Sequence, residues 1–196
     1  LRKVADGWCA AEAWAIDTVD KTSLEDKHLL RVEYELLQRC EQNIAAVLSG
    51  LCDPVHLLFP SGDTSMLAHL YCDSYAASFM NDLMAAMVAH IQAHFPVDRP
   101  LRILEIGAGT GGSTSKILNA IDTSRVQYCF SDISPQFLQA AKKRFGDDGN
   151  VSYAILDLDN CEQAEAHLQA YDLILATNVV HATRDIHASI NTIKTL

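Results

Sequence analysis

Leu101-Arg-Ile-Leu-Glu-Ile-Gly-Ala-Gly-Thr-Gly-Gly112 is the stretch that decides the fold of this chain. Its first half is apolar and has the length of a buried strand, and its second half is rich in glycine. Gly107, Gly109 and Gly112 match the spacing that lets a backbone approach a nucleotide closely. The N–H groups at the start of the following helix can bind the same ligand. The stretch therefore predicts a βα unit with a nucleotide-binding turn.

Glu105 makes the expected ligand more specific. It lies two residues before the first glycine, where a dinucleotide-binding strand more often carries an aliphatic residue. A carboxylate at this place repels a pyrophosphate and attracts a cation. S-adenosylmethionine carries an ammonium group and a sulfonium centre, so the acid favours this cofactor. The structural alternative is a solvated Glu beside an ordinary glycine-rich turn.

Composition describes an acidic globular protein. The 196 residues are 49% hydrophobic and 20% charged, which suffices for one sizeable core. The 15 basic and 25 acidic residues give a formal charge of −10, and basic residues do not gather with aromatic ones. Both observations argue against nucleic acid as the main partner.

The cysteines and the hydropathy pattern indicate the compartment. The six cysteines form no Cys-x-x-Cys pair, and no histidine cluster has metal-ligand spacing, so we expect reduced thiols and no metal. No apolar run has the length of a membrane span, and the start lacks the order of a signal peptide. We therefore expect a cytoplasmic protein that does not contact membranes.

The chain divides at the proline-flanked stretch from Phe95 to Pro100. Residues 1–96 show helical periodicity, and we expect an all-helical lid and substrate region there. One amphipathic helix is predicted up to Gly50. A second is predicted from Met80 to Ile91, whose apolar stripe we assign to core packing rather than to a methionine-lined cofactor pocket.

Residues 97–196 alternate between strand and helix patterns. Four short apolar runs are each followed by a helix-compatible segment, and they are Leu101–Ile106, Val126–Ser131, Val151–Leu156 and Tyr171–Thr177. Such βα units predict a Rossmann-like parallel sheet with helices on both faces. Ser134 and Pro135 are expected to start a helix that Gly146 ends, and Asp185 to start the last one.

Carboxylates follow two of the later strands, at the edge where ligands of such sheets bind. Asp132 comes directly after the second strand, where an acid can accept both hydroxyls of an adenosine ribose. The alternative role of Asp132 is a helix N-cap. Asp157 ends the third strand, and its carboxylate can accept the exocyclic amine of adenine. Asp159 competes for this assignment.

The fourth strand leads into Ala176-Thr-Asn-Val-Val-His-Ala-Thr183, which places Asn178 and His181 beyond the same edge. An imidazole titrates near neutral pH, so His181 can act as a general base if a second group fixes its tautomer. The alternative is a hydrogen-bonded loop histidine without a catalytic role.

Taken together, these segments resemble the carbon-methyltransferase domains of polyketide synthases and of hybrid polyketide–nonribosomal peptide synthases. Residues 103–112, 130–135 and 176–183 look like the three core motifs of that family, in order. Asp53-Pro-Val-His-Leu-Leu-Phe-Pro60 and Leu70-Tyr-Cys-Asp-Ser74 resemble its helical lid. The first motif occurs in most S-adenosylmethionine-dependent methyltransferases, whereas the third motif and the lid are more specific.

The resemblance implies a class I methyltransferase that methylates the α-carbon of a β-ketoacyl thioester on an acyl carrier protein. It assigns the methionine end of the cofactor to Glu105 and the glycine turn, the ribose to Asp132, the adenine to Asp157 and the base to His181. The further residues that it assigns to the cofactor are Gly107, Ala108, Gly109, Ile133, Leu158, Asn178 and a lid tyrosine, either Tyr71 or the nearby Tyr75.

The chemistry of these groups is consistent with that reaction. A proton between a ketone and a thioester is acidic enough for an imidazole to remove, which leaves an enolate carbon as the nucleophile. A hydrogen-bond donor at the enolate oxygen favours methylation on carbon. Asn178 is a candidate for this donor, and the alternative is that it positions the cofactor. The family's glutamate partner of the histidine has no counterpart in this sequence.

Several other functions stay open at this point. The sequence provides four strands, fewer than the family's sheet, so we expect either further strands outside it or an inactive structural domain within a megasynthase. Methylation of nitrogen or oxygen on a small molecule or peptide intermediate is a second alternative. A dehydrogenase shares the glycine pattern and is a third.

Overall fold

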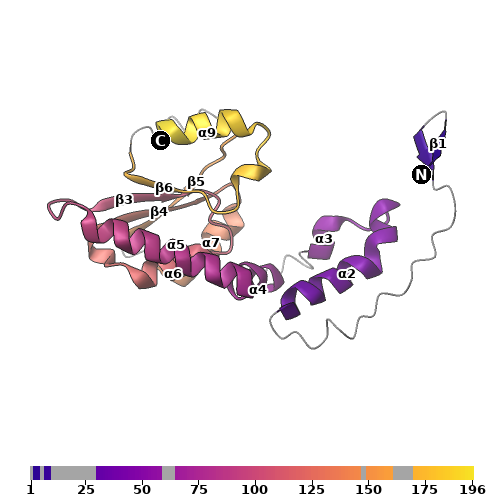
Figure 1. The fold of residues 1–196 in the computed structure, drawn as a ribbon, viewed down its shortest axis with the longest axis horizontal. Helices are drawn as coiled ribbons and strands as arrows, with labels where there is room; N and C mark the ends of the chain where they lie inside the picture. The colour runs from indigo at the N-terminus through magenta and orange to yellow at the C-terminus, as the bar shows by residue number, and fades with distance from the viewer. Residues whose placement is uncertain (1, 5–6, 10–29, 59–64, 147–148, 161–169) are drawn as a thin grey trace.

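The computed structural model describes residues 2–4, 7–9, 30–58, 65–146, 149–160 and 170–196 (Figure 1). Its strands are β1 (Arg2–Val4), β2 (Gly7–Cys9), β3 (Leu101–Glu105), β4 (Val126–Asp132), β5 (Val151–Ile155) and β6 (Leu173–Leu175). Its α-helices are α2 (Arg31–Leu48), α3 (Pro54–Leu58), α4 (Ser65–Cys72), α5 (Tyr75–His94), α6 (Gly112–Ala120), α7 (Pro135–Phe145) and α9 (Ile186–Thr195). Two 3-10 helices, η3 (Thr123–Arg125) and η4 (Val180–Ala182), complete the described elements.

The second half of the chain forms a parallel sheet in the order β5-β4-β3-β6. Leu101 of β3 lies opposite Val126 of β4, Ile103 opposite Leu173 of β6, and Tyr128 of β4 opposite Val151 of β5. The four predicted strands and the Rossmann-like architecture are thereby confirmed. Strand order reverses at β3, so a crevice opens beyond the carboxyl ends of β3 and β6.

Alternation along β3 builds a core on both faces of the sheet. Leu101 and Ile103 pack with Val88 of α5 and Ile117 of α6 on one face. Leu104 points to the other face and packs in a second cluster with Leu156, Leu158 and Leu196. Figure 1 shows α5 and α6 on one side of the sheet and α9 on the other. A strand buried on both faces explains the continuous apolar run in the sequence.

The buried face of α5 differs from the prediction. The residues that α5 buries are Asn81, Ala85, Val88 and Gln92, whereas Met80 and Met87 are 55% and 53% exposed. Gln92 is buried because its side chain bonds both backbone groups of Asp122, as donor to the oxygen at 2.8 Å and as acceptor from the nitrogen at 2.9 Å. Leu83 and Ile91 of the same stripe are also exposed, so the assignment of the stripe to the core is wrong for four of its residues.

The predicted helix ends are confirmed in α7 and α9. Pro135 begins α7, and Gly146 ends it with a left-handed φ of +83°. Asp185 caps α9, where its Oδ1 accepts from the N–H groups of His187 at 2.9 Å and Ala188 at 3.1 Å. Such an N-cap satisfies amide groups that have no partner within the helix.

The described elements before α5 are not entirely helical. The helix predicted up to Gly50 is confirmed as α2, but β1 pairs with β2 in an antiparallel hairpin. These strands are too short to produce a periodic pattern in the sequence, so the expectation of an all-helical region is wrong there. Within the lid motif, Phe59 and Pro60 lie outside the described residues.

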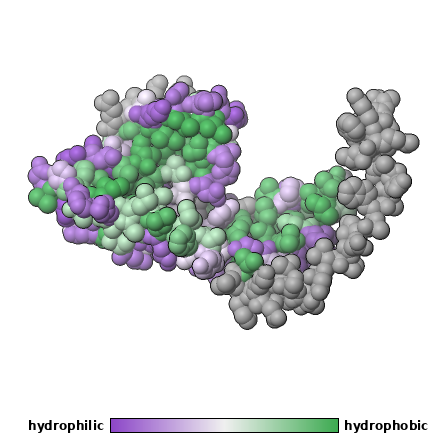
Figure 2. All heavy atoms as spheres, viewed as in Figure 1, coloured by the Kyte–Doolittle hydropathy of each residue, from purple (hydrophilic) through white to green (hydrophobic). Residues whose placement is uncertain are grey.

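The helices α2, α3 and α4 bury none of their described residues. Figure 1 shows α2 beside α4 and α3 beside α2, away from the sheet, and Figure 2 shows apolar side chains on their surface. The helix α5 instead packs on the sheet, although it precedes residue 97. The division of the chain at residue 96 stays a prediction.

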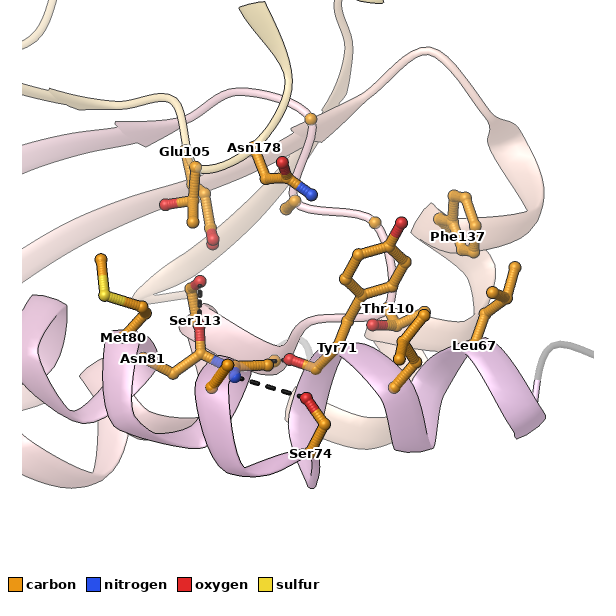
Figure 3. Close-up of a pocket in the computed structure, with 18 of the residues that line it drawn as sticks. Leu67, Tyr71, Ser74, Met80, Asn81, Glu105, Thr110, Ser113, Phe137 and Asn178 are labelled. Carbon is orange, nitrogen blue, oxygen red and sulfur yellow. Dashed lines mark hydrogen bonds between the residues drawn. The ribbon is translucent and has the colours of Figure 1, made fainter. Parts of the chain in front are cut away.

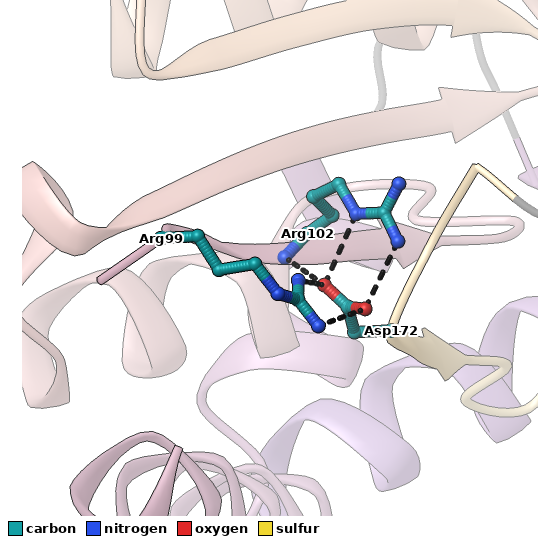
Figure 4. A network of polar contacts seen from close by, with 3 residues as sticks. All are labelled: Arg99, Arg102 and Asp172. Atoms are coloured by element: carbon teal, nitrogen blue, oxygen red, sulfur yellow. Dashed lines mark hydrogen bonds and ion pairs between the residues drawn. The ribbon is translucent and has the colours of Figure 1, made fainter. Parts of the chain in front are cut away.

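An ion-pair network closes the amino end of the sheet, opposite the crevice (Figure 4). Asp172, just before β6, accepts from Arg99 Nη1 at 2.7 Å and from Arg102 Nη2 at 3.0 Å. It also accepts from the backbone nitrogen of Arg102 at 3.1 Å. These bonds, first to Arg102 and then to Arg99, hold the pKa of Asp172 well below its usual range. The network joins β3 to β6.

Other expectations concern thiols, metals and membranes. The four cysteines with described side chains, Cys40, Cys52, Cys72 and Cys129, are free thiols. The described residues contain no group of three or more His, Cys, Asp or Glu side chains that could hold a metal ion. None of the described helices is both long enough and apolar enough to cross a bilayer.

Candidate active site

A cavity of about 810 Å³ lies beyond the carboxyl ends of β3 and β6, between the glycine turn and the helices α4 and α5 (Figure 3). The predicted site residues that line it are Tyr71, Glu105, Gly107, Ala108, Gly109 and Asn178. Tyr75 does not line it. The structure therefore brings the first and third motifs and one lid tyrosine to one place.

Glu105 is the acid at the inner wall of this cavity. It points to the same face of the sheet as Leu101 and Ile103, and it is 1% exposed. Its Oε2 accepts from the hydroxyl of Thr114 at 2.5 Å and from that of Tyr128 at 2.6 Å. Burial raises the pKa of Glu105 to about 7, against the effect of both hydrogen bonds. The carboxyl group can therefore exist in either charge state near neutral pH.

The glycine turn needs glycine for two separate reasons. Gly107, Gly109 and Gly111 all have left-handed φ values, of +62°, +56° and +74°. At Gly107 a Cβ would also lie 2.3 Å from a methyl group of Val179. At Gly109 the nearest atom to such a Cβ is 3.8 Å away. Glycine is thus required at residue 107 by the close approach of Val179 in the third motif, and at residue 109 by the left-handed backbone.

Asp132 supports this turn from the neighbouring strand. Its Oδ2 accepts from the N–H of Gly109 at 2.9 Å, and its Oδ1 accepts from the N–H of Ser134 at 2.8 Å. Asp132 does not line the cavity, and neither does Ile133, which is 62% exposed. Asp132 therefore joins the glycine turn to the start of α7. The N-cap of α7 is Ser134, so the alternative role of Asp132 as a helix N-cap is wrong.

Asp157 and Leu158 follow β5 and lie outside the cavity. Asp157 Oδ1 accepts from the N–H of Asp159 at 2.9 Å. Asp159 in turn accepts from the N–H of Arg184, at 3.1 Å, beyond the third motif. Leu158 is buried in the cluster under α9, so its side chain faces the core. Any contact of Leu158 with a ligand would have to use its backbone.

Asn178 and His181 have different environments in the third motif. Asn178 lines the cavity and has a left-handed φ of +57°. Among the described residues, it is the only one other than glycine with a positive φ. A backbone of this kind often marks a functional site. His181 lies in η4, where it is exposed and does not line the cavity. Among the described residues, none hydrogen-bonds to its ring. The catalytic role of His181 stays a prediction.

The lid is attached to the glycine turn through a residue that the sequence analysis missed. Asn81 of α5 is buried, donates to the backbone oxygen of Tyr71 at 2.9 Å and accepts from the hydroxyl of Ser113 at 2.8 Å. Gly112 allows this approach, since a Cβ there would lie 2.7 Å from the same Tyr71 oxygen. A polar residue in the apolar pattern of α5 is the signal that could have identified Asn81.

Apolar side chains form the other wall of the cavity. Leu67 and Leu70 of α4, Ala77 and Met80 of α5 and Phe137 of α7 all line it. Figure 3 shows Leu67, Tyr71 and Phe137 facing the cavity on the side away from Glu105. The cavity thus has an acidic end and an apolar end, a combination that suits a cationic ligand beside an apolar one.

Comparisons with known proteins place the chain among methyltransferase domains. A family model for a methyltransferase domain matches residues 104–196. The non-reducing polyketide synthase mapC of Penicillium brevicompactum is 34% identical over 171 residues, which are 84% of this chain and 7% of that protein. The chain therefore spans a small part of the length of that relative.

Solved structures extend the comparison. The CurJ carbon methyltransferase superimposes with a TM-score of 0.82 and 34% identity, over 90% of this chain and 47% of that one. The trans-methyltransferase CalH, solved as a complex with S-adenosylhomocysteine, superimposes with a TM-score of 0.68 and 28% identity, over 89% of this chain and 48% of that one. Residues 104–196 therefore match a methyltransferase domain, and the chain has the Rossmann-like methyltransferase fold and is similar to carbon-methyltransferase domains of polyketide synthases.

Proposed function

We propose that this domain transfers the methyl group of S-adenosylmethionine to the α-carbon of a β-ketoacyl chain. In this proposal the β-ketoacyl group is held as a thioester on the phosphopantetheine arm of an acyl carrier protein, within a polyketide synthase. The observation that carries the proposal is the two-sided cavity, which places the buried Glu105 and the glycine turn opposite an apolar lid. The identities with mapC and the CurJ carbon methyltransferase support the same reaction class.

The acidic end of the cavity fits the methyl donor. Glu105 attracts the ammonium group, and the turn of Gly107, Ala108 and Gly109 allows backbone contact with the methionine part. Asp132 and Ile133 are assigned to the ribose and Asp157 and Leu158 to the adenine, as the family resemblance implies. When bound, the donor supplies an electrophilic methyl group on its sulfonium centre.

His181 is assigned as the general base. A ring nitrogen would take the proton between the two carbonyl groups of the acceptor. The enolate carbon would then bond to the methyl carbon as the bond from that carbon to sulfur breaks, which leaves the donor as a neutral thioether. Asn178, which lines the cavity three residues before His181, can donate its amide hydrogen to the enolate oxygen. The exposed position of His181 suits a base that meets an incoming acceptor.

The charge of the chain bears on how the carrier protein reaches it. Carrier domains are usually acidic, and this chain has a formal charge of −10, so long-range attraction does not bring the two together. Tethering within one megasynthase raises the effective concentration of the carrier to about the millimolar range. We therefore expect free carrier protein to bind this domain weakly.

The decisive experiment combines a β-ketoacyl thioester with S-adenosylmethionine and identifies the methylated atom by mass spectrometry and NMR. We expect methylation at the α-carbon. His181→Ala should lower turnover by about 10²- to 10⁴-fold, the usual contribution of a general base. The affinity for the donor should stay unchanged, since His181 lies outside the cavity. His187→Ala, at another exposed histidine of the described chain, is the matched control and should be neutral.

Other outcomes identify the alternatives. Full turnover in His181→Ala would remove the base assignment. Methyl transfer to nitrogen or oxygen would identify a different methyltransferase, and no binding heat with S-adenosylmethionine would indicate a structural domain. The division at residue 96 and a cytoplasmic location remain predictions beside this proposal.

A further inference from the structure

Two buried hydroxyl groups meet at one oxygen of Glu105, deep in the wall of the cavity. Thr114 belongs to α6 and is 0% exposed, and Tyr128 belongs to β4 and is 1% exposed. Both donate to Oε2, at 2.5 Å and 2.6 Å. These distances are at the short end of the range for O–H donors to a carboxylate. The three side chains form a closed cluster that we call the acid clamp.

The sheet register explains why these residues meet. Tyr128 lies opposite Ile103, two residues before Glu105, so the tyrosine and the acid project from the same face of the sheet. The helix α6 covers that face and starts directly after the glycine turn, which places Thr114 above the carboxyl group. The clamp therefore depends on the same turn that is expected to hold the methyl donor.

The clamp favours the anionic form of the acid, whereas the surroundings oppose it. Both hydroxyls stabilise a carboxylate, but burial removes water from it, and the nearby Asp132 repels it. The other charged group on this side of α6, Lys116, is paired with Asp82 of α5 at 2.7 Å. The strand β6 contributes Leu173–Leu175, which do not titrate, and α4 contributes Tyr71 at the cavity. The described residues form no ion pair with Glu105, so in this inference the balancing cation comes with the ligand.

We propose that Tyr128 and Thr114 are positioning residues that hold the Glu105 carboxylate for the ammonium group of the methyl donor, and that donor binding releases one proton from this carboxyl group. The inference rests on the proposed function, because it takes S-adenosylmethionine as the ligand of the cavity. It adds two residues and a proton to that function.

The direction of the pH dependence follows from the charges. With the pKa of Glu105 raised to about 7, acidic solution keeps the carboxyl group neutral in the free protein. A cationic ligand needs the anion, so each pH unit below that value weakens binding by about tenfold. Affinity should thus fall by about 20-fold between pH 7.5 and pH 5.5.

The test is calorimetric titration of the 196-residue chain with S-adenosylmethionine from pH 5.5 to 7.5, in two buffers with different ionisation enthalpies. The difference between the buffers counts the protons released. We expect close to one proton at pH 5.5 and less than half of one at pH 7.5. Glu105→Gln should bind weakly and without pH dependence.

Variants of the clamp distinguish positioning from a merely structural role. Tyr128→Phe keeps the ring and removes one donor, so the free carboxyl group should hold its proton to higher pH. Affinity at pH 7.5 should fall about tenfold, and the pH of half-maximal affinity should rise. Thr114→Val makes the same test if Tyr128→Phe does not fold. Tyr153→Phe removes a hydroxyl that donates to the Gly146 oxygen at 2.6 Å, away from the clamp, and should change neither value.

The outcomes separate the inference from the function on which it rests. Tight binding without pH dependence or proton release would overturn the inference and leave the proposed function intact. A clamp variant that folds and keeps the wild-type pH profile would also overturn it. Absence of binding at every pH would instead remove both.

Discussion

The groups assigned to the methyl donor and the groups assigned to the chemistry are held in different ways. On the donor side, Glu105 and Asp132 are buried, and each accepts two hydrogen bonds from neighbouring elements. In the third motif, Asn178 has a left-handed backbone, and His181, which lies outside the cavity, is exposed without a hydrogen-bonded partner among the described residues. The fold itself therefore fixes the side chains assigned to the donor through hydrogen bonds. The positions of the side chains assigned to the chemistry are expected to be set when the ligands bind.

The largest expected effect is at the contact between the glycine turn and the third motif. Gly107→Ala adds a Cβ within 2.3 Å of Val179 and imposes a left-handed alanine. We expect a loss of about 3 kcal/mol in the free energy of unfolding and at least tenfold weaker donor binding. Urea denaturation and calorimetry measure the two effects.

Gly109→Ala is the matched control for that variant. It has nearly the same φ, but the nearest atom to its Cβ is 3.8 Å away. We expect a loss of about 1 kcal/mol, from the backbone alone. Equal losses in the two alanine variants would show that the contact between Gly107 and Val179 contributes nothing.

A second prediction concerns the attachment of the lid to the donor side. Asn81→Ala leaves the Tyr71 oxygen and the Ser113 hydroxyl without their buried partner. We expect a loss of about 2 kcal/mol in stability. Faster hydrogen exchange should be confined to α4 and to the start of α6. Uniform exchange across the sheet would contradict this local role of Asn81.

The left-handed backbone of Asn178 predicts a smaller change in stability, whose sign depends on the residue that replaces it. Asn178→Ala should cost about 1 kcal/mol in stability, because alanine is less tolerant than asparagine of a φ of +57°. Asn178→Gly should be neutral or slightly stabilising, since glycine adopts this backbone freely. Thermal unfolding of both variants is the measurement. If alanine and glycine have the same effect, the left-handed backbone carries no strain.

The smallest effect is expected at the amino end of the sheet, opposite the cavity. Asp172→Asn weakens the bonds to Arg99 and Arg102, which are partly exposed, and should cost about 0.5 to 1 kcal/mol at pH 7. The folded pKa of Asp172 is depressed, so its contribution is complete above the unfolded pKa of about 4. It is lost as the pH falls through the folded pKa. The wild-type and variant stabilities should therefore converge in acid, while donor binding at pH 7 stays unchanged.

The sequence predicted the sheet well because its strands are buried on both faces. The apolar runs at Leu101 and Val126 stand out for this reason, and both observed strands begin at those residues. The face of α5 was mispredicted because Asn81 and Gln92 are buried through hydrogen bonds, which hydropathy does not register.

The same limit applies to the site. Glu105, the glycine turn and Asn178 could be predicted because each lies in a short sequence motif. The structure places them together at the cavity. The partnership of Tyr128 with Glu105 depends on the register between two strands, which no local pattern contains.

The close packing of Gly107 under Val179 has a consequence for how such a domain can change over time. The turn expected to hold the cofactor packs directly against the segment that leads to the assigned base, with no space left for a larger side chain at Gly107. A bulkier residue on one side requires a smaller one on the other, so cofactor affinity and catalytic geometry cannot drift independently. Related sequences should therefore show paired, compensating replacements at these two positions.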